Sequence, residues 1–345
     1  MKKPFLIFVP GILGTELRDI DGRMIWGGNV AAILDTLCVH PRALGRDTLR
    51  VGKVIESITK PGGEIKVYGP MLGMIRDKLG YQEGEFHAFG YDWRQSNVDT
   101  AADLARFIRQ KVASGVEKFS IIAHSMGGIV TRLALQDSGN ADLLTRLCSY
   151  VQIATPVRGS SLAYAGLKRG PTFHPLFDRI RDIITRLAPL RLHDLLDSLG
   201  GCDSMFQLLP PEDEKILRKK SGLLSDPFDH SAWPPQYQGA LTRAQAVHTP
   251  IQAVPPCEHY IVLSDGLDTD YSYLVDLDFD IVDIFQQAPG DGTVCGYSAR
   301  AGSADKTRVT LNAPIPHDEL PNDARVFDMI VNGRWLVTAA ERGAQ

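Results

Sequence analysis

The feature that most constrains the fold is a buried-strand pattern that runs directly into a helical pattern, with a serine where the two meet. The apolar run Phe119–Ala123 predicts a strand, and apolar residues at 129, 133 and 135 predict a helix that begins immediately after Ser125. A serine at such a tight turn is typical of a nucleophile whose hydroxyl projects from the crease. An ordinary helix cap is the alternative. The short pattern small-x-Ser-x-Gly does not choose between them, because it arises easily by chance.

Short apolar segments alternate with helical patterns along most of the chain. Between the second and third segments, residues 104, 108 and 112 are apolar at the spacing of a helix. Strands that alternate with helices predict an α/β fold with a mostly parallel sheet covered on both faces. The predicted strands are Phe5–Val9, Glu85–Phe89, Phe119–Ala123, Tyr150–Ala154, Tyr260–Leu263 and Arg308–Leu311.

The alternation stops between residues 159 and 256. This stretch is rich in helical patterns and Pro-Pro punctuation and lies between two predicted core strands. Long connections with helices of their own are usually functional or form a separate lobe. We therefore expect a core of residues 1–158 and 257–345, with a helical cap of residues 159–256 inserted between its two parts.

Composition excludes several classes of protein. A net charge of −4 over 345 residues does not suggest a nucleic-acid-binding protein. The five scattered cysteines contain no C-x-x-C pair, which fits a reducing compartment, and we expect no metal and no cofactor. The apolar run at residues 5–9 is too short for a signal peptide, and we expect a cytoplasmic protein.

A serine nucleophile needs a histidine base that is oriented by a carboxylate. In the α/β-hydrolase arrangement the chain order is nucleophile, acid, histidine. His317 is the only histidine after residue 259, and it follows a predicted strand. Asp291, between Gly290 and Gly292, is the preferred acid, and Asp265 in Ser-Asp-Gly is the alternative.

Backbone N–H groups are expected to stabilise the oxyanion of the transition state. One donor should be the residue after the nucleophile, here Met126. The other should come from the glycine-containing loop after the first strand, and we assign it to Ile12, with Leu13 as the alternative.

Six motifs occur in order over nearly the whole chain, and together they resemble the lecithin:cholesterol acyltransferase family. The resemblance implies an α/β-hydrolase with a cap, a Ser125–Asp291–His317 triad and backbone donors at Ile12 and Met126. Ala123 replaces the glycine at the start of the family's serine motif. The motifs are VPGILGTEL (9–17), GYDWR (90–94), AHSMGG (123–128), ATPVRGS (154–160), SMFQLLP (204–210) and GDGTV (290–294).

The sequence thus predicts a serine-dependent enzyme that hydrolyses or transfers the acyl group of a lipid ester. Leu13, Trp93 and Phe206 are candidate substrate-binding residues, whereas the Asp92 and Arg94 pair is expected to brace its loop. A soluble carboxylesterase for small esters and a non-catalytic scaffold that binds lipid or protein are the alternatives.

We also expect transient contact between the cap and a membrane surface. A helical apolar pattern in the cap is the reason, although a helix packed on the core has the same pattern. The pattern comprises Leu176, Ile180, Ile183, Ile184 and Leu187.

Overall fold

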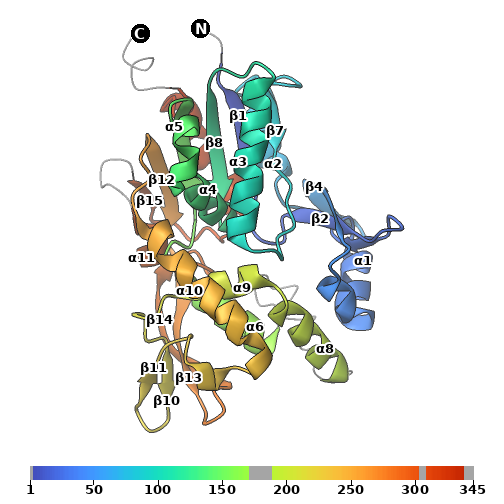
Figure 1. The fold of residues 1–345 in the computed structure, drawn as a ribbon, viewed down its shortest axis with the longest axis vertical. Helices are drawn as coiled ribbons and strands as arrows, with labels where there is room; N and C mark the ends of the chain where they lie inside the picture. Colours follow the sequence, from blue (N-terminus) through green and yellow to red (C-terminus); the bar gives the residue numbers. More distant parts are fainter. Residues whose placement is uncertain (1–2, 171–188, 303–307, 338–345) are drawn as a thin grey trace.

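The centre of the molecule is a six-stranded sheet in which every pair of neighbours is parallel (Figure 1). The computed structural model describes residues 3–170, 189–302 and 308–337. Across the sheet, the strand order is β15 (Arg308–Leu311), β12 (His259–Ser264), β9 (Leu147–Ile153), β8 (Phe119–His124), β1 (Phe5–Val9) and β7 (Phe86–Ala88). The predicted parallel sheet is therefore confirmed, and two of the predicted strands have the bounds expected from the sequence.

Both faces of this sheet are covered, because alternate side chains of its strands point to opposite sides. In β1, Ile7 packs in one core cluster with Leu104 of α3 (Asn97–Ala113) and Ile129 of α4 (Met126–Gln136). Phe8 packs in a second cluster, with side chains from α2 (Gly69–Asp77) and α12 (Ala324–Asn332). The short helix α5 (Ala141–Leu144) lies beside α3 and α4. This covered parallel sheet is the predicted α/β-hydrolase architecture.

A second part of the molecule extends beyond the carboxyl ends of the strands (Figure 1). Between β9 and β12 the chain forms α6 (Ser161–Arg169), α8 (Pro189–Gly200), α9 (Asp203–Gln207) and α10 (Gln238–Gln252). A four-stranded sheet joins β11 (Leu224–Ser225) and β10 (Leu217–Lys219) to the hairpin of β13 (Leu267–Val275) and β14 (Ile281–Gly290), which precedes α11 (Gly296–Ala299). Strand pairing thus links the proposed cap to residues 267–290, and the division at residues 159 and 256 stays a proposal.

Residues 15–66 form a third element that the sequence analysis did not predict. The strands β2 (Thr15–Arg18), β3 (Met24–Trp26) and β4 (Arg50–Val54) make an antiparallel sheet. The hairpin of β5 (Ser57–Lys60) and β6 (Gly63–Lys66) and the helix α1 (Val30–Leu34) lie beside it. These strands are three to five residues long and most of them mix polar with apolar side chains, so no long apolar run marks them in the sequence.

Two of our expectations concern membranes. Within the described ranges, no helix has the length and apolar character that crossing a bilayer requires. The segment from Leu176 to Leu187, from which we inferred membrane contact, lies outside the described residues.

Candidate active site

Ser125 lies at the turn between β8 and α4, in a backbone conformation that side chains rarely adopt. Its φ is 53° and its ψ is −128°, and α4 begins at the next residue. Gly127 and Gly128, which follow the serine, allow the start of α4 to pack closely against neighbouring segments. A Cβ on Gly127 would lie 2.4 Å from the Pro10 carbonyl oxygen, and a Cβ on Gly128 would overlap the hydroxyl of Thr155. The local sequence therefore builds a strained turn that presents the serine at the carboxyl edge of the sheet.

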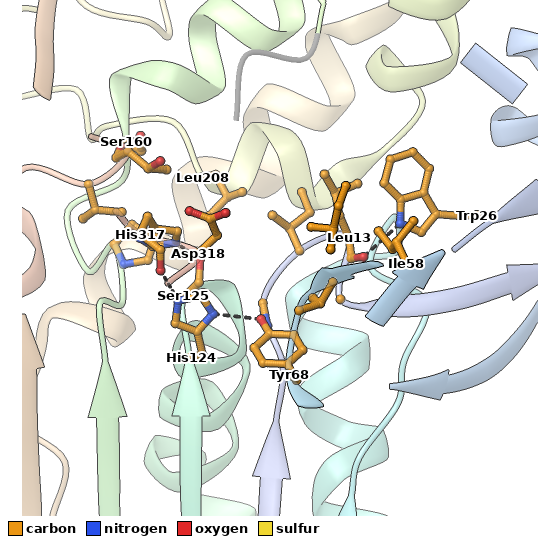
Figure 2. A pocket seen from close by; sticks show the side chains of 18 of the residues that line it. Leu13, Trp26, Ile58, Tyr68, His124, Ser125, Ser160, Leu208, His317 and Asp318 are labelled. Atoms are coloured by element: carbon orange, nitrogen blue, oxygen red, sulfur yellow. Dashed lines mark hydrogen bonds between the residues drawn. The ribbon is translucent and has the colours of Figure 1, made fainter. Parts of the chain in front are cut away.

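The structure brings Ser125, His317 and Asp291 together, although they are far apart in the sequence. Figure 2 shows His317 beside Ser125. His317 Nε2 lies 2.8 Å from Ser125 Oγ, and His317 Nδ1 lies 2.8 Å from Asp291 Oδ2. Asp291 follows β14, and His317 lies in the loop after β15. A serine hydroxyl, an imidazole and a carboxylate in this order can transfer a proton away from the serine oxygen.

The Asp291 carboxylate is only 2% exposed and is held by its own loop. Its Oδ1 accepts hydrogen bonds from the N–H groups of Thr293 (3.0 Å) and Val294 (2.7 Å), which leaves Oδ2 for the imidazole. In addition, the His317 N–H donates to the Asp291 carbonyl oxygen at 2.9 Å. Asp265, the alternative acid, instead pairs with Arg300. The geometry therefore favours Asp291.

Two opposing effects act on the protonation of His317. Burial lowers the pKa of its imidazole, but the charge and hydrogen bond of Asp291, together with the charge of Asp318, raise it. The net result is a pKa above the usual value of histidine. An imidazole that gains affinity for a proton beside a serine hydroxyl is suited to act as a general base.

The loop after β1 lies against the nucleophile. Residues 11–14 form a turn in which the Gly14 N–H donates to the Gly11 carbonyl oxygen at 3.2 Å. A Cβ on Gly11 would lie 2.8 Å from the Ser125 Cβ, so only glycine permits this approach. Among the described residues, the N–H groups of Ile12 and Met126 donate to no other group. Both are therefore available to a substrate, and their role as oxyanion donors stays a prediction.

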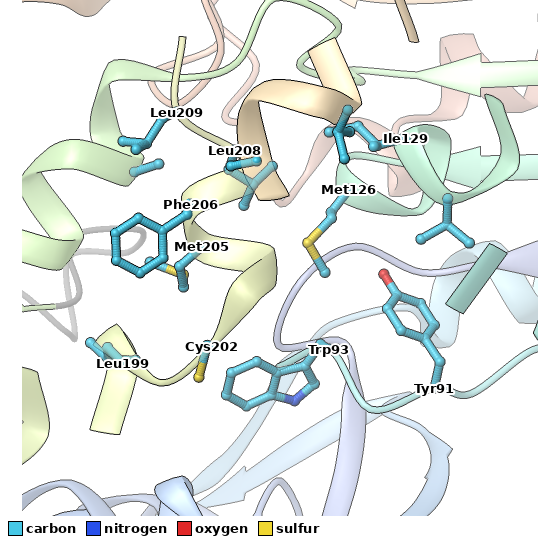
Figure 3. Close-up of a cluster of buried hydrophobic side chains, with 14 of the residues drawn as sticks. Tyr91, Trp93, Met126, Ile129, Leu199, Cys202, Met205, Phe206, Leu208 and Leu209 are labelled. Atoms are coloured by element: carbon cyan, nitrogen blue, oxygen red, sulfur yellow. The ribbon is translucent and has the colours of Figure 1, made fainter. Parts of the chain in front are cut away.

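A cavity of 170 Å³ opens beside Ser125 and His317. Leu13, a candidate substrate-binding residue, lines it. Trp93 and Phe206 are absent from its wall and lie in the neighbouring buried cluster (Figure 3). Most of the apolar wall comes from residues 12–67, of which the sequence analysis named only Ile12 and Leu13 as site residues, and the cap contributes fewer of the described residues. The apolar side chains of that N-terminal wall are Ile12, Leu13, Trp26, Val30, Ile33, Ile58, Ile65 and Val67.

The sequence analysis also missed a buried hydrogen-bonded chain beneath the site. The Gly11 N–H donates to the hydroxyl of Tyr68 (2.8 Å), which lies 2.8 Å from His124 Nδ1. His124 Nε2 in turn lies 3.1 Å from the carbonyl oxygen of His317. Burial and the nearby charge of His317 hold the pKa of His124 well below its usual value. His124 is thus a neutral, hydrogen-bonded neighbour of the nucleophile.

The Asp92 and Arg94 pair was expected from the sequence to brace its loop. Arg94 donates from Nε (2.9 Å) and from its NH2 nitrogen (2.6 Å) to the Asp92 carboxylate, and its NH1 nitrogen donates to the carbonyl oxygens of Leu44 and Arg46. These bonds brace the loop after β7.

Within the described ranges, no cluster of three or more His, Cys, Asp or Glu side chains is placed to bind a metal.

Comparison with known proteins relates the chain to one family. Residues 53–186 match the family model "Lecithin:cholesterol acyltransferase", a range that includes Ser125 but ends before Asp291 and His317. The chain is 34% identical to "Lecithin-cholesterol acyltransferase-like 4" of Arabidopsis thaliana over 86 residues. These residues make up 24% of this chain and 16% of that protein. The match thus spans about a sixth of the relative's length. The resemblance that the motifs indicated is confirmed over residues 53–186, which include three of the six motifs.

The fold is shared, at low sequence identity, with a solved structure. A chain of the Tle4-Tli4 complex superposes with a TM-score of 0.69 at 16% identity, covering 95% of this chain and 97% of that chain. The mature lipase BlEst2 of Bacillus licheniformis has a TM-score of 0.45 at 14% identity, covering 97% and 92% of the two chains. At such identities the Tle4-Tli4 similarity concerns the fold alone.

Proposed function

Because residues 53–186 relate this chain to the lecithin:cholesterol acyltransferase family, we propose that it hydrolyses or transfers the acyl group of a lipid ester through Ser125. The observation that carries the proposal is the position of His317, 2.8 Å from both the serine oxygen and the Asp291 carboxylate. The family match and the strained serine turn support the same assignment. The apolar cavity beside them supports a substrate with a hydrocarbon chain.

The proposed reaction has two stages. His317 Nε2 takes the hydroxyl proton while Ser125 Oγ attacks the ester carbonyl, and Asp291 stabilises the imidazolium that forms. The N–H groups of Ile12 and Met126 bind the negative oxygen of the tetrahedral intermediate. His317 then returns the proton to the leaving alcohol, so that the ester bond breaks and the acyl group stays on Ser125.

The second stage releases the acyl group to an acceptor. His317 removes a proton from water or from an alcohol, which attacks the acyl-enzyme, and the proton then returns to Ser125 Oγ. In water we propose hydrolysis as the prevailing outcome, with acyl transfer when a lipid alcohol reaches the acyl-enzyme first. The expected membrane contact through the cap is a proposal of the same kind, because a lipid ester must be withdrawn from a surface.

A fluorophosphonate probe tests this assignment directly. Wild-type protein should be labelled at one site per chain, and Ser125→Ala should lose both the label and at least about 10⁴-fold of kcat. Wild-type turnover in Ser125→Ala would contradict the proposal. Absence of both labelling and ester hydrolysis in wild-type protein would favour the non-catalytic scaffold.

A panel of substrates then separates the remaining alternatives. Phospholipid, monoacylglycerol and short-chain esters should be offered with and without an alcohol acceptor. A preference for acetate esters over all lipid esters would favour the small-ester carboxylesterase instead.

A further inference from the structure

One peptide group next to the nucleophile is held at both of its polar ends by tyrosine hydroxyls. The hydroxyl of Tyr91 donates to the Pro10 carbonyl oxygen at 2.8 Å, and the Gly11 N–H donates to the hydroxyl of Tyr68 at 2.8 Å. This carbonyl and this N–H belong to the same planar peptide unit. Both tyrosines are buried, at 5% and 4% exposure, so water does not compete for these bonds. The plane therefore cannot rotate without breaking two buried hydrogen bonds.

The directions of the remaining bonds follow from the donors and acceptors present. The His317 carbonyl oxygen can only accept, so His124 Nε2 carries the proton in their 3.1 Å bond. A neutral imidazole then has an acceptor at Nδ1, to which the Tyr68 hydroxyl donates over 2.8 Å. Burial raises the pKa of Tyr68, and therefore its hydroxyl keeps this proton. The hydroxyl thus accepts from Gly11 and donates to His124, and its one proton is already used.

The clamped peptide immediately precedes the proposed oxyanion donor. Gly11 approaches Ser125 so closely that a Cβ would lie 2.8 Å from the serine Cβ. The next peptide carries the Ile12 N–H, so a rotation of the Pro10–Gly11 plane would turn this N–H away from the reacting oxygen. A displacement of about 1 Å is enough to cost a large factor in rate.

We propose that Tyr68 and Tyr91 are positioning residues that fix the Ile12 N–H as an oxyanion donor before substrate binds. Through His124, the same hydrogen-bonded chain attaches the oxyanion loop to the backbone of His317. The loop that carries Ile12 and the loop that carries His317 are therefore held in fixed positions relative to each other. This inference rests on the proposed function. It assigns roles to two tyrosines that do not take part in the proton transfers themselves.

The variants Tyr68→Phe and Tyr91→Phe each remove one end of the clamp and keep the ring. Tyr164→Phe is the matched control, because Tyr164 is also buried and its hydroxyl donates at 2.7 Å to a carbonyl oxygen, that of Phe279, within the part of the molecule beyond the sheet. The readouts are kcat and KM for p-nitrophenyl butyrate and the affinity for an alkyl trifluoromethyl ketone. Such a ketone forms a tetrahedral adduct with a serine and thus reports on oxyanion binding. All rates are normalised to active sites counted by fluorophosphonate labelling at completion.

We expect both tyrosine variants to lose about tenfold in kcat, less than the 10²-fold or more of a removed donor. Their affinity for the trifluoromethyl ketone should fall by a similar factor, whereas KM should stay within about twofold. Tyr164→Phe should match wild type in all three measurements. A merely structural role would lower the melting temperature without this parallel loss of kcat and ketone affinity.

Three results would overturn the inference. Unchanged kcat per active site and unchanged ketone affinity in both variants would show that the clamp does not position the donor. Loss in Tyr68→Phe alone would show that Tyr68, which lines the cavity, contacts the reacting atoms itself. If Tyr68→Phe does not fold, Tyr91→Phe decides alone, and wild-type values there would refute the clamp.

A separate result concerns the proposed function rather than the tyrosines. If wild-type protein takes up no fluorophosphonate and shows no esterase activity, the proposed function fails, and the inference falls with it. That failure is seen before any tyrosine is changed, so the two are distinguishable.

Discussion

The hairpin of β5 and β6 offers a direct test of where the acyl chain binds. Ile58 is half-buried, faces Ile65 across the hairpin, and both line the cavity beside Ser125. Thr59 is the next residue, is exposed and points to the opposite face of the hairpin. We predict that Ile58→Asp weakens the preference for longer acyl chains, and that Thr59→Asp, with the same added charge, leaves it intact.

The expected size of the effect follows from the apolar wall. Each buried CH₂ contributes about 0.8 kcal/mol, and about 1.4 kcal/mol corresponds to tenfold in rate, so each carbon is worth up to about fourfold in kcat/KM. Four carbons, from butyrate to octanoate, thus give at most about 200-fold. A carboxylate at position 58 that exposes two CH₂ groups would cost about 1.6 kcal/mol, roughly 15-fold, on octanoate and nothing on acetate.

The assay is kcat/KM for p-nitrophenyl acetate, butyrate and octanoate below their aggregation limits, per labelled active site. The kcat/KM of wild type and of Thr59→Asp should rise with chain length. Ile58→Asp should rise roughly 15-fold less between acetate and octanoate, with its value on acetate unchanged. The reasoning is refuted if wild type prefers acetate, or if both variants lose the same factor on all three esters. In the first case the substrate is a small ester, and in the second the hairpin acts through stability.

Three further predictions follow from the site. Asp291→Asn should lower kcat by about 10⁴-fold; because the carboxylate raises the pKa of His317, the loss of activity as the pH falls should also move to lower pH, which a pH–rate profile measures. Ile12→Pro, which removes the N–H, should cost at least about 10²-fold in kcat, whereas Ile12→Ala should be mild, and equal losses would indicate packing instead. Gly128→Ala should lower the melting temperature, since the added methyl overlaps Thr155, and an unchanged melting temperature would contradict the tight turn.

Local patterns and chain order were enough to predict the sheet and the contact among Ser125, Asp291 and His317. The strand Phe5–Val9 is a continuous buried run, and the strand before Ser125 leads into its helix without a loop, so neighbouring residues alone determine both. His317 was identifiable because the order of nucleophile, acid and histidine left a single histidine after residue 259. In each case the signal lies within a few residues or in chain order.

Features that depend on contacts between residues far apart in the sequence could not be predicted from local patterns. Asp265 and Asp291 both follow strands and both adjoin glycine, but in the fold Asp291 contacts His317 whereas Asp265 pairs with Arg300. The cavity wall was missed because residues such as Ile58 lie on short strands that become a wall only when folded against the core. Likewise, the bond between Gly11 and Tyr68 joins residues 57 positions apart.

The most direct test of the central claim is the mass of the acyl-enzyme. Protein mixed with p-nitrophenyl octanoate, quenched in acid and digested should yield one peptide that carries an octanoyl group, with the modification at Ser125. The same peptide from Ser125→Ala should be unmodified, and the initial burst of p-nitrophenol should be absent. An octanoyl group on any other residue, or full turnover in Ser125→Ala, would contradict the account.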